Sequence, residues 1–208
     1  MNNNYYGYNS ENIKMWNPSI EVESSNGVRS VDLLTRLLSE RRIFLNGDVT
    51  DEMANDFVAE MLHLAQTREP VNIYLNTRGG SVDAGLIIYD VIQACKDRVE
   101  INIYCTGMAA SMGAVILAGG QKGRRFILPH SRCMIHEPLI SGGFGGSASS
   151  IKKTSDSILE TKNILNGILA KHTGRSLKEI DEATSYDNYL NAKEAVEFGL
   201  ADAISYVL

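Results

Sequence analysis

Cysteine is scarce in this chain, and its scarcity argues against a fold held together by disulfides or structural zinc. The sequence contains 3 cysteines, an odd number, and their spacing fits no zinc-binding template. Cys95, Cys105 and Cys133 each lie in an apolar run. We therefore predict buried, reduced thiols in a cytoplasmic protein.

Long apolar runs and clusters of one charge are also missing. No apolar stretch approaches the roughly 18 residues of a membrane span, so we expect no contact with a membrane. Residues 1–9 have neither the basic start nor the hydrophobic segment of a secretion signal, which again predicts a cytoplasmic protein. The formal charge is −5, from 20 Lys and Arg against 25 Asp and Glu, and no basic cluster indicates a nucleic-acid surface.

Loops that hold nucleotides are not evident. No glycine-rich loop ends in Gly-Lys-Ser or Gly-Lys-Thr, the pattern that cradles phosphates. Gly143-Phe-Gly145 follows Pro138-Leu-Ile-Ser141 and not a strand, which disfavours a dinucleotide site. We expect the chain to hydrolyse no ATP itself and to need no cofactor.

What is present suits one α/β domain. The 208 residues are 44% hydrophobic and 22% charged. Residues 1–18 are rich in Asn and Tyr and predict a flexible tail, which leaves 19–208 as a single domain. Periodicity predicts strands at 43–45, 71–75, 99–105, 125–128 and 133–136. Helices are predicted at 31–38, 50–65, 82–95, 112–118 and 149–171, with two more capped by Ser176 and Asn191. Such alternation is typical of a largely parallel sheet.

Two glycine-containing segments follow predicted strands and have the setting of a catalytic site. In residues 107–113, Ser111 opens a predicted helix, where free backbone N–H groups favour developing negative charge. The alternative is a tightly packed helix with Ser111 as its N-cap. In residues 76–80, consecutive glycines suit an oxyanion-hole N–H donor or an ordinary tight turn.

The sequence has 4 histidines, and one is favoured as a general base. His136 ends a predicted strand, where it would project from the sheet edge. His63 lies on an amphipathic helix, His130 follows a proline, and His172 ends the longest helix. Aspartates are too numerous for a third catalytic residue to be chosen by position alone.

Three ordered motifs resemble the proteolytic subunits of the Clp protease (the ClpP family). Gly107-Met-Ala-Ala-Ser-Met-Gly-Ala114 with residues 116–120 resembles the family's nucleophile segment. Met134-Ile-His-Glu-Pro-Leu139 resembles its histidine segment, and Tyr186-Asp-Asn-Tyr-Leu190 with residues 192–202 its aspartate segment. Together with residues 30–45 and 53–62, the resemblance covers about 20–208.

The resemblance implies a serine endopeptidase with Ser111 as nucleophile, His136 as base and Asp187 as the residue that orients the base. It implies that the backbone N–H groups of Gly80 and Met112 bind the oxyanion. The implied fold is the ClpP/crotonase-like ββα superhelix, with a protruding handle at about 139–171.

The resemblance also implies partners. Heptameric rings, stacked as a tetradecamer, would enclose the sites, and a partner AAA+ Clp ATPase would use ATP to feed in unfolded polypeptides. The glycine-rich residues 142–146 would bind extended substrate as an edge strand. Other hypotheses are a phage-type head-maturation protease with the same triad, a crotonase-fold acyl-CoA enzyme and an inactive scaffold subunit.

This chain departs from the family pattern at three places. Arg78 stands where a proline is usual before the Gly-Gly turn, which predicts a looser turn or another ionic contact. Ser185-Tyr186 replaces an acidic residue and arginine that link the rings in many members. The N-terminal tail is also longer and richer in Asn and Tyr than is usual. We expect ring stacking to depend more on the apolar stripe between Ile151 and Leu169.

Overall fold

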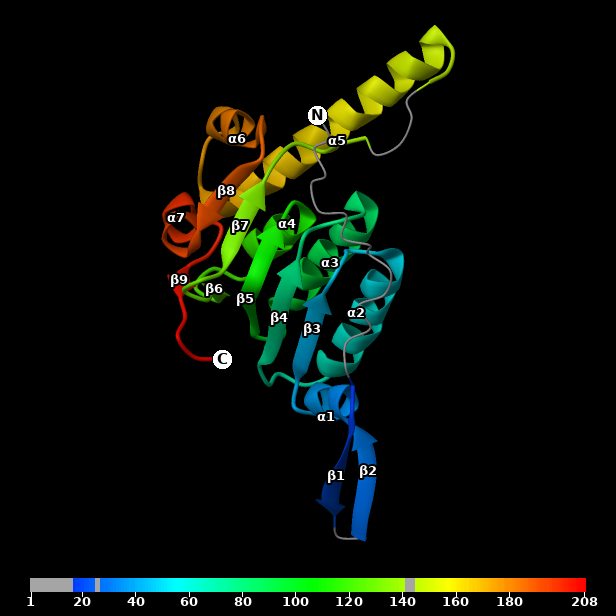
Figure 1. The fold of residues 1–208 in the computed structure, drawn as a ribbon, viewed down its shortest axis with the longest axis vertical. Coiled ribbons are helices and arrows are strands. Elements are labelled where there is room, and N and C mark those ends of the chain that lie inside the picture. The colour runs from blue at the N-terminus through cyan, green and yellow to red at the C-terminus, as the bar shows by residue number, and fades with distance from the viewer. Residues whose placement is uncertain (1–16, 25–26, 141–144) are drawn as a thin grey trace, which may run out of the picture.

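The computed structural model describes residues 17–24, 27–140 and 145–208, which form a mixed α/β architecture (Figure 1). The helices in these ranges are α1 (Leu33–Ser39), α2 (Asp51–Leu64), α3 (Val82–Cys95), α4 (Met112–Ala118), α5 (Ala148–Thr173), α6 (Leu177–Thr184) and α7 (Ala192–Phe198). The strands are β1 (Ser19–Ser24), β2 (Gly27–Asp32), β3 (Arg42–Asn46), β4 (Val71–Thr77), β5 (Ile101–Ala110), β6 (Arg125–Ile127), β7 (Arg132–Ile135), β8 (Asn188–Asn191) and β9 (Ala203–Ile204). The predicted alternation of strands and helices is confirmed.

Parallel pairing dominates the seven-stranded sheet, as predicted. Its strands run in the order β3-β4-β5-β6-β9, while β7 pairs in parallel with β5 and β8 pairs antiparallel with β7. The register aligns Ile43 with Ile73 and Ile73 with Ile103, and each of these side chains is at most 1% exposed. Helices α2, α3 and α4 cover this face of the sheet (Figure 1). Parallel strands end at one edge, so the segments after β3, β4, β5 and β7 meet there.

Aromatic side chains line the opposite face of the sheet. Phe44, Tyr74, Tyr104 and Phe126 stack in register across β3 to β6, with ring centroids 5.0, 5.6 and 5.0 Å apart. Alternation along a strand sends neighbouring side chains to opposite faces, which separates this row from the aliphatic core. Cross-strand aromatic pairs of this kind stabilise the sheet beyond the area that they bury.

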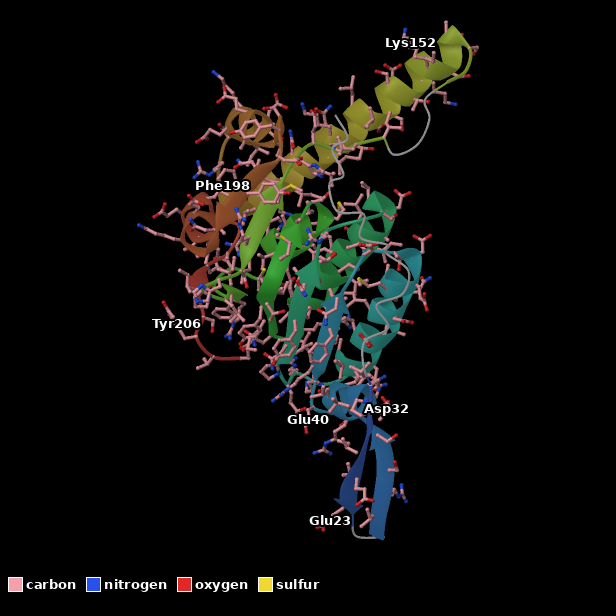
Figure 2. All side chains as sticks on the ribbon, in the orientation of Figure 1. Glu23, Asp32, Glu40, Lys152, Phe198 and Tyr206 are labelled. Atoms are coloured by element: carbon pink, nitrogen blue, oxygen red, sulfur yellow. The ribbon has the colours of Figure 1, made fainter. Side chains whose placement is uncertain are left out.

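The start of the domain differs from the prediction. Residues 19–32 contain a hairpin of β1 and β2 that extends away from the body (Figure 1). Helix α1 begins at Leu33 and not at Val31, because Asp32 accepts the Thr35 N–H and caps the helix. Figure 2 shows Asp32 where the hairpin joins the body.

The predicted tail and edge strand fall mainly outside the described residues. Residues 1–16 of the tail and 141–144 of the glycine-rich segment are not described. Asn17 and Pro18, predicted as part of the tail, are bound to the body. The Leu34 N–H donates to Asn17 Oδ1 at 2.9 Å, and the Leu33 N–H donates to the Pro18 carbonyl at 2.9 Å.

Helix α5 is the longest helix described, and its far half extends beyond the body, as predicted for a handle (Figure 1). The apolar stripe predicted along it does not act as one surface. Leu165 and Leu169 are buried at 7% and 3% exposure, whereas Ile151 and Ile164 are 39% and 48% exposed. Only the exposed members are therefore accessible to another subunit, and the dependence of ring stacking on the stripe stays a prediction.

The prediction of buried cysteines without disulfides is confirmed, because all three cysteines are free and buried.

Among the described helices, none combines the length and the hydropathy that crossing a membrane requires.

A buried ion pair joins three helix ends to the sheet. Arg125 is 1% exposed and donates from Nε and Nη2 to Asp202 at 2.9 and 2.6 Å. Its Nη1 donates to three carbonyl oxygens, those of Ala118, His172 and Gly199. Burial by itself would raise the pKa of Asp202. The hydrogen bonds and charge of Arg125 outweigh it and hold that pKa at about 2.

We expect Asp202→Asn to lower the free energy of unfolding at neutral pH by about 3–5 kcal/mol, because it leaves the Arg125 charge buried without its counter-ion. Since the folded pKa of Asp202 lies below the ordinary value of about 3.9, this stabilisation is present at neutral pH and is lost as the pH falls from about 5 toward 1. Urea unfolding from neutral to acidic pH measures both effects, and the variant should show the flatter pH dependence.

Glu100→Gln is the matched control for this pair. It removes the partner of Arg124 from an ion pair whose side chains are 42% and 35% exposed. A surface pair of that kind contributes at most about 1 kcal/mol. Equal losses from Glu100→Gln and Asp202→Asn would contradict the importance of burial.

Candidate active site

Ser111 occupies a strained position between β5 and α4. Its backbone has φ 53° and ψ −120°, and a positive φ is uncommon outside glycine. The Ser111 N–H donates to the Met134 carbonyl at 2.8 Å, which ties the turn to β7. Ser111 occupies the N-cap position of α4, but its side chain makes no capping hydrogen bond. Strain of this kind is typical of functional positions.

The turn after β4 packs directly against Ser111. A Cβ atom added to Gly79 would lie 2.6 Å from the Ser111 Cβ, and Gly79 has φ 99°, so only glycine fits. The Gly79 N–H donates to Thr77 Oγ1 at 3.0 Å, and the Gly79 carbonyl accepts the Val49 N–H at 2.9 Å. These bonds hold the turn that contains Arg78.

His136 lies between Ser111 and Asp187. Its Nε2 is 2.9 Å from Ser111 Oγ, and its Nδ1 is 3.1 Å from Asp187 Oδ1. With the proton on Nδ1, the ring donates to the carboxylate and accepts the serine O–H, as a base in a serine triad requires. The His136 side chain is 14% exposed, and that of Asp187 is 61% exposed.

Strand pairing brings the last two residues together. His136 follows β7, Asp187 precedes β8, and the antiparallel register aligns Ile135 with Asn188. An antiparallel strand begins at the edge where its neighbour ends. Asp187 therefore reaches the same edge of the sheet as Ser111 and His136.

A cavity of about 520 Å³ opens beside the serine. Ser111, His136, Gly80 and Met112 line it, together with apolar side chains from several elements: Val82, Val115, Ile135, Pro138, Leu139, Leu165 and Leu169. The predicted nucleophile, base and oxyanion donors thus face one cavity. Its walls suit an apolar side chain of a bound peptide.

The backbone N–H groups of Gly80 and Met112 are the predicted oxyanion donors, and both residues line the cavity. Gly80 forms a parallel bridge with Val49 through the groups on either side of it: the Val49 N–H donates to Gly79, and the Ser81 N–H donates to Val49. In parallel pairing, the N–H of Gly80 itself then points away from Val49. Met112 opens α4, where the first N–H groups have no partner within the helix.

The other histidines do not approach this site. His172 lies within hydrogen-bond distance of the Tyr89 hydroxyl, at 2.9 Å, and burial, followed by nearby Lys171, lowers its pKa to about 4. His63 is exposed on α2, and His130 is exposed in the loop before β7. The apolar wall of the cavity is not predicted by the sequence; two of its members, Leu165 and Leu169, belong to the stripe that is expected to join the rings.

The family model described as Clp protease matches residues 25–207, which is most of the chain. The mixed α/β architecture and mainly parallel sheet agree with the fold of that family. The chain therefore belongs to the Clp protease family and is a ClpP-type peptidase.

Proposed function

We propose that this peptidase is a serine endopeptidase in which Ser111, His136 and Asp187 form the catalytic triad. The observation that carries the proposal is the continuous chain of contacts from Ser111 Oγ through the His136 ring to Asp187, at 2.9 and 3.1 Å. The family match favours this activity over an acyl-CoA reaction on a related fold. The proposed chemistry uses side chains and backbone N–H groups, with no cofactor.

In the proposed reaction, Ser111 Oγ attacks the carbonyl carbon of the scissile peptide while its proton passes to His136 Nε2. The carbonyl oxygen becomes an oxyanion that accepts hydrogen bonds from the N–H groups of Gly80 and Met112. The carbon–nitrogen bond then breaks, and His136 returns the proton to the leaving amine. Water repeats the sequence on the acyl-enzyme and releases Ser111. Asp187 holds the imidazole in the productive tautomer and stabilises its protonated form.

We further propose that the subunit works within heptameric rings, stacked as a tetradecamer, and with a Clp ATPase that supplies unfolded polypeptides. Members of this family are generally oligomeric and work with Clp ATPases. The exposed apolar side chains on projecting α5 are consistent with a contact between subunits: Ile151 at 39%, Leu159 at 53% and Ile164 at 48%. Burial of such side chains is favourable in an oligomer.

We expect the purified chain to cleave short peptides without ATP and to spare a folded protein. Short peptides need no unfolding, and the sequence offers no phosphate-binding loop to drive it. A fluorogenic peptide with an apolar residue before the cleaved bond, labelling by a fluorophosphonate and the mass of the assembly test the proposal together. ATP-stimulated digestion of a folded substrate by this chain alone would contradict it, as would a failure of the fluorophosphonate to label Ser111.

A further inference from the structure

The contact between His136 and Asp187 is weakly supported where it is made. Asp187 is 61% exposed, and a hydrogen bond to an exposed charged group adds little to the free energy that holds its two partners together. Strand β8, which follows Asp187, pairs with β7 at the edge of the sheet. The β7–β8 register ends at Ile135 and Asn188, so contacts beyond this ladder also hold the base and the carboxylate at their spacing.

A second set of contacts joins the same segments on the side of α5. The Glu137 N–H, one residue after His136, donates to the Thr184 carbonyl at 2.7 Å. Thr184 lies three residues before Asp187 and is 0% exposed; its hydroxyl donates to the Ile180 carbonyl at 2.9 Å and lies 3.3 Å from Asn166 Oδ1 of α5. Helix α5 thus contacts the segment that leads into Asp187.

Lys162 connects both segments through one ammonium group. Its Nζ lies 3.0 Å from Glu137 Oε2 and 2.8 Å from Asp181 Oδ1 of α6. Asn166, one turn along the same face of α5, also donates to Asp181 Oδ1 at 3.3 Å. Hydrogen bonds to Asp181 and then to Glu137 raise the pKa of Lys162, so the bridge stays charged. The Lys162 side chain is 21% exposed.

We propose that Lys162 is a positioning residue for the triad. Lys162 holds Glu137 and Asp181 at a fixed separation. Because His136 precedes Glu137 and Asp187 follows Asp181 in the chain, this contact keeps the base aligned with its carboxylate. The inference rests on the proposed function, since it assigns Lys162 a role in the same reaction. Lys162 is not among the residues that line the cavity, so it acts on the rate of the chemical step and not on substrate binding.

The bridge is better suited to alignment than to folding stability. The carboxylates of Glu137 and Asp181 are 43% and 58% exposed, and ion pairs with exposed partners add little to the free energy of folding. Catalysis is more sensitive, because a displacement of about 1 Å in a reacting group costs up to about 100-fold in rate. Loss of the bridge should therefore change activity far more than stability.

We expect Lys162→Met to lower kcat on a fluorogenic peptide by about 10- to 100-fold, with KM within about twofold of the wild-type value. Methionine keeps most of the side-chain length but not the charge. Lys162→Arg should restore most of kcat, since a guanidinium group also binds two carboxylates. The urea midpoint and the mass of the assembly should be unchanged in both variants.

Lys178→Met is the matched control. Lys178 pairs with Glu182 at 3.9 Å on α6, the helix that carries Asp181, and its side chain is 86% exposed. This pair does not reach the segment after His136. Lys178→Met should have wild-type kcat and KM.

A double-mutant cycle separates positioning from a general structural role. If Lys162 acts through Asp187, Lys162→Met should cost less than about twofold in kcat once Asp187→Asn is present. A full second loss in that background would overturn the inference. So would wild-type kcat in Lys162→Met, or a loss of kcat that follows a lowered urea midpoint.

Asp181→Ala tests the same bridge should Lys162→Met fail to assemble, because alanine offers no acceptor to Lys162 Nζ, and wild-type kcat there would also overturn the inference. Ser111→Ala distinguishes the two levels of the proposal. An active Ser111→Ala enzyme would refute the proposed function itself. An inactive one, combined with wild-type kcat in Lys162→Met, would refute the positioning role alone.

Discussion

Ser111→Ala should abolish peptide cleavage and fluorophosphonate labelling while leaving the subunit folded and assembled. The substitution removes the oxygen that forms the acyl-enzyme, and loss of a triad serine lowers kcat by about 10⁶. The side chain makes no capping bond to α4, so its loss should cost the fold little. Steady-state hydrolysis of a fluorogenic peptide, with the mass of the assembly measured on the same sample, checks both statements.

Two further substitutions make this result specific. Ser205→Ala removes a serine near the C-terminus whose hydroxyl donates to the Val207 carbonyl, and it should remain fully active. Ser111→Gly should be as inactive as Ser111→Ala but more stable by about 1 kcal/mol, because glycine tolerates φ 53° without strain. More than a few per cent of wild-type activity in Ser111→Ala would mean that another residue is the nucleophile.

Local signals in the sequence predicted much of the fold that surrounds this serine. The bounds predicted for α3 and α4 agree with the structure, because Ser81 caps one helix and a run of small residues precedes the other. The helix caps predicted at Ser176 and Asn191 are also present, each as a capping box. In each case, the residues that determine the structure are close together in the chain.

Structure that depends on distant partners was predicted less well. Strand β5 extends to Ala110, five residues beyond its predicted end at Cys105, because β7 pairs with Met108 to Ala110. Strand β8 has four residues and no apolar alternation, so its pairing with β7 is its main determinant. The β1–β2 hairpin was missed although its signals are local, since its two strands are consecutive in the chain, Ile20 and Val22 alternate with polar residues, and Asn26-Gly27 is a typical hairpin-turn sequence.

The same distinction applies to the candidate site. A strand followed by small residues and a helix identified Ser111 as a candidate, and the end of a strand favoured His136. The choice of Asp187 needed the family resemblance, since no local pattern separates it from the other aspartates. Lys162 could not be found from the sequence, because its partners Glu137 and Asp181 are 25 and 19 residues away along the chain. Only the packing of α5 against α6 brings them together.

Asp187→Asn should preserve the fold and lower kcat by between about 10² and 10⁴. The upper figure applies where a rigid site fixes the amide so that it stabilises the wrong imidazole tautomer. Here the side chain is 61% exposed in the isolated subunit, so the amide is free to rotate and present its oxygen to His136 Nδ1. The tautomer would then be kept, but the negative charge that stabilises the imidazolium would be lost.

Assembly gives a way to decide where the loss falls in this range. If neighbouring subunits cover Asp187 in the assembled protein, the amide is held more rigidly and the loss should approach 10⁴. Peptidase activity and the mass of the assembly should therefore be measured on the same samples, for Asp187→Asn and for Asp187→Ala. Alanine offers no acceptor to Nδ1, so Asp187→Ala should be at least as inactive as Asp187→Asn in either state.

Asp97→Asn provides the control for a change of one carboxylate to an amide. Asp97 is exposed in the turn before β5, at the edge of the sheet opposite to the triad, and its replacement should leave kcat unchanged.

Near wild-type kcat in Asp187→Asn and Asp187→Ala would show that His136 is oriented without this carboxylate, although His136 Nδ1 lies 3.1 Å from Asp187 Oδ1 in the isolated subunit. Since both segments are also joined through Glu137 and Thr184, that result would assign the orientation of the base to the backbone of this junction.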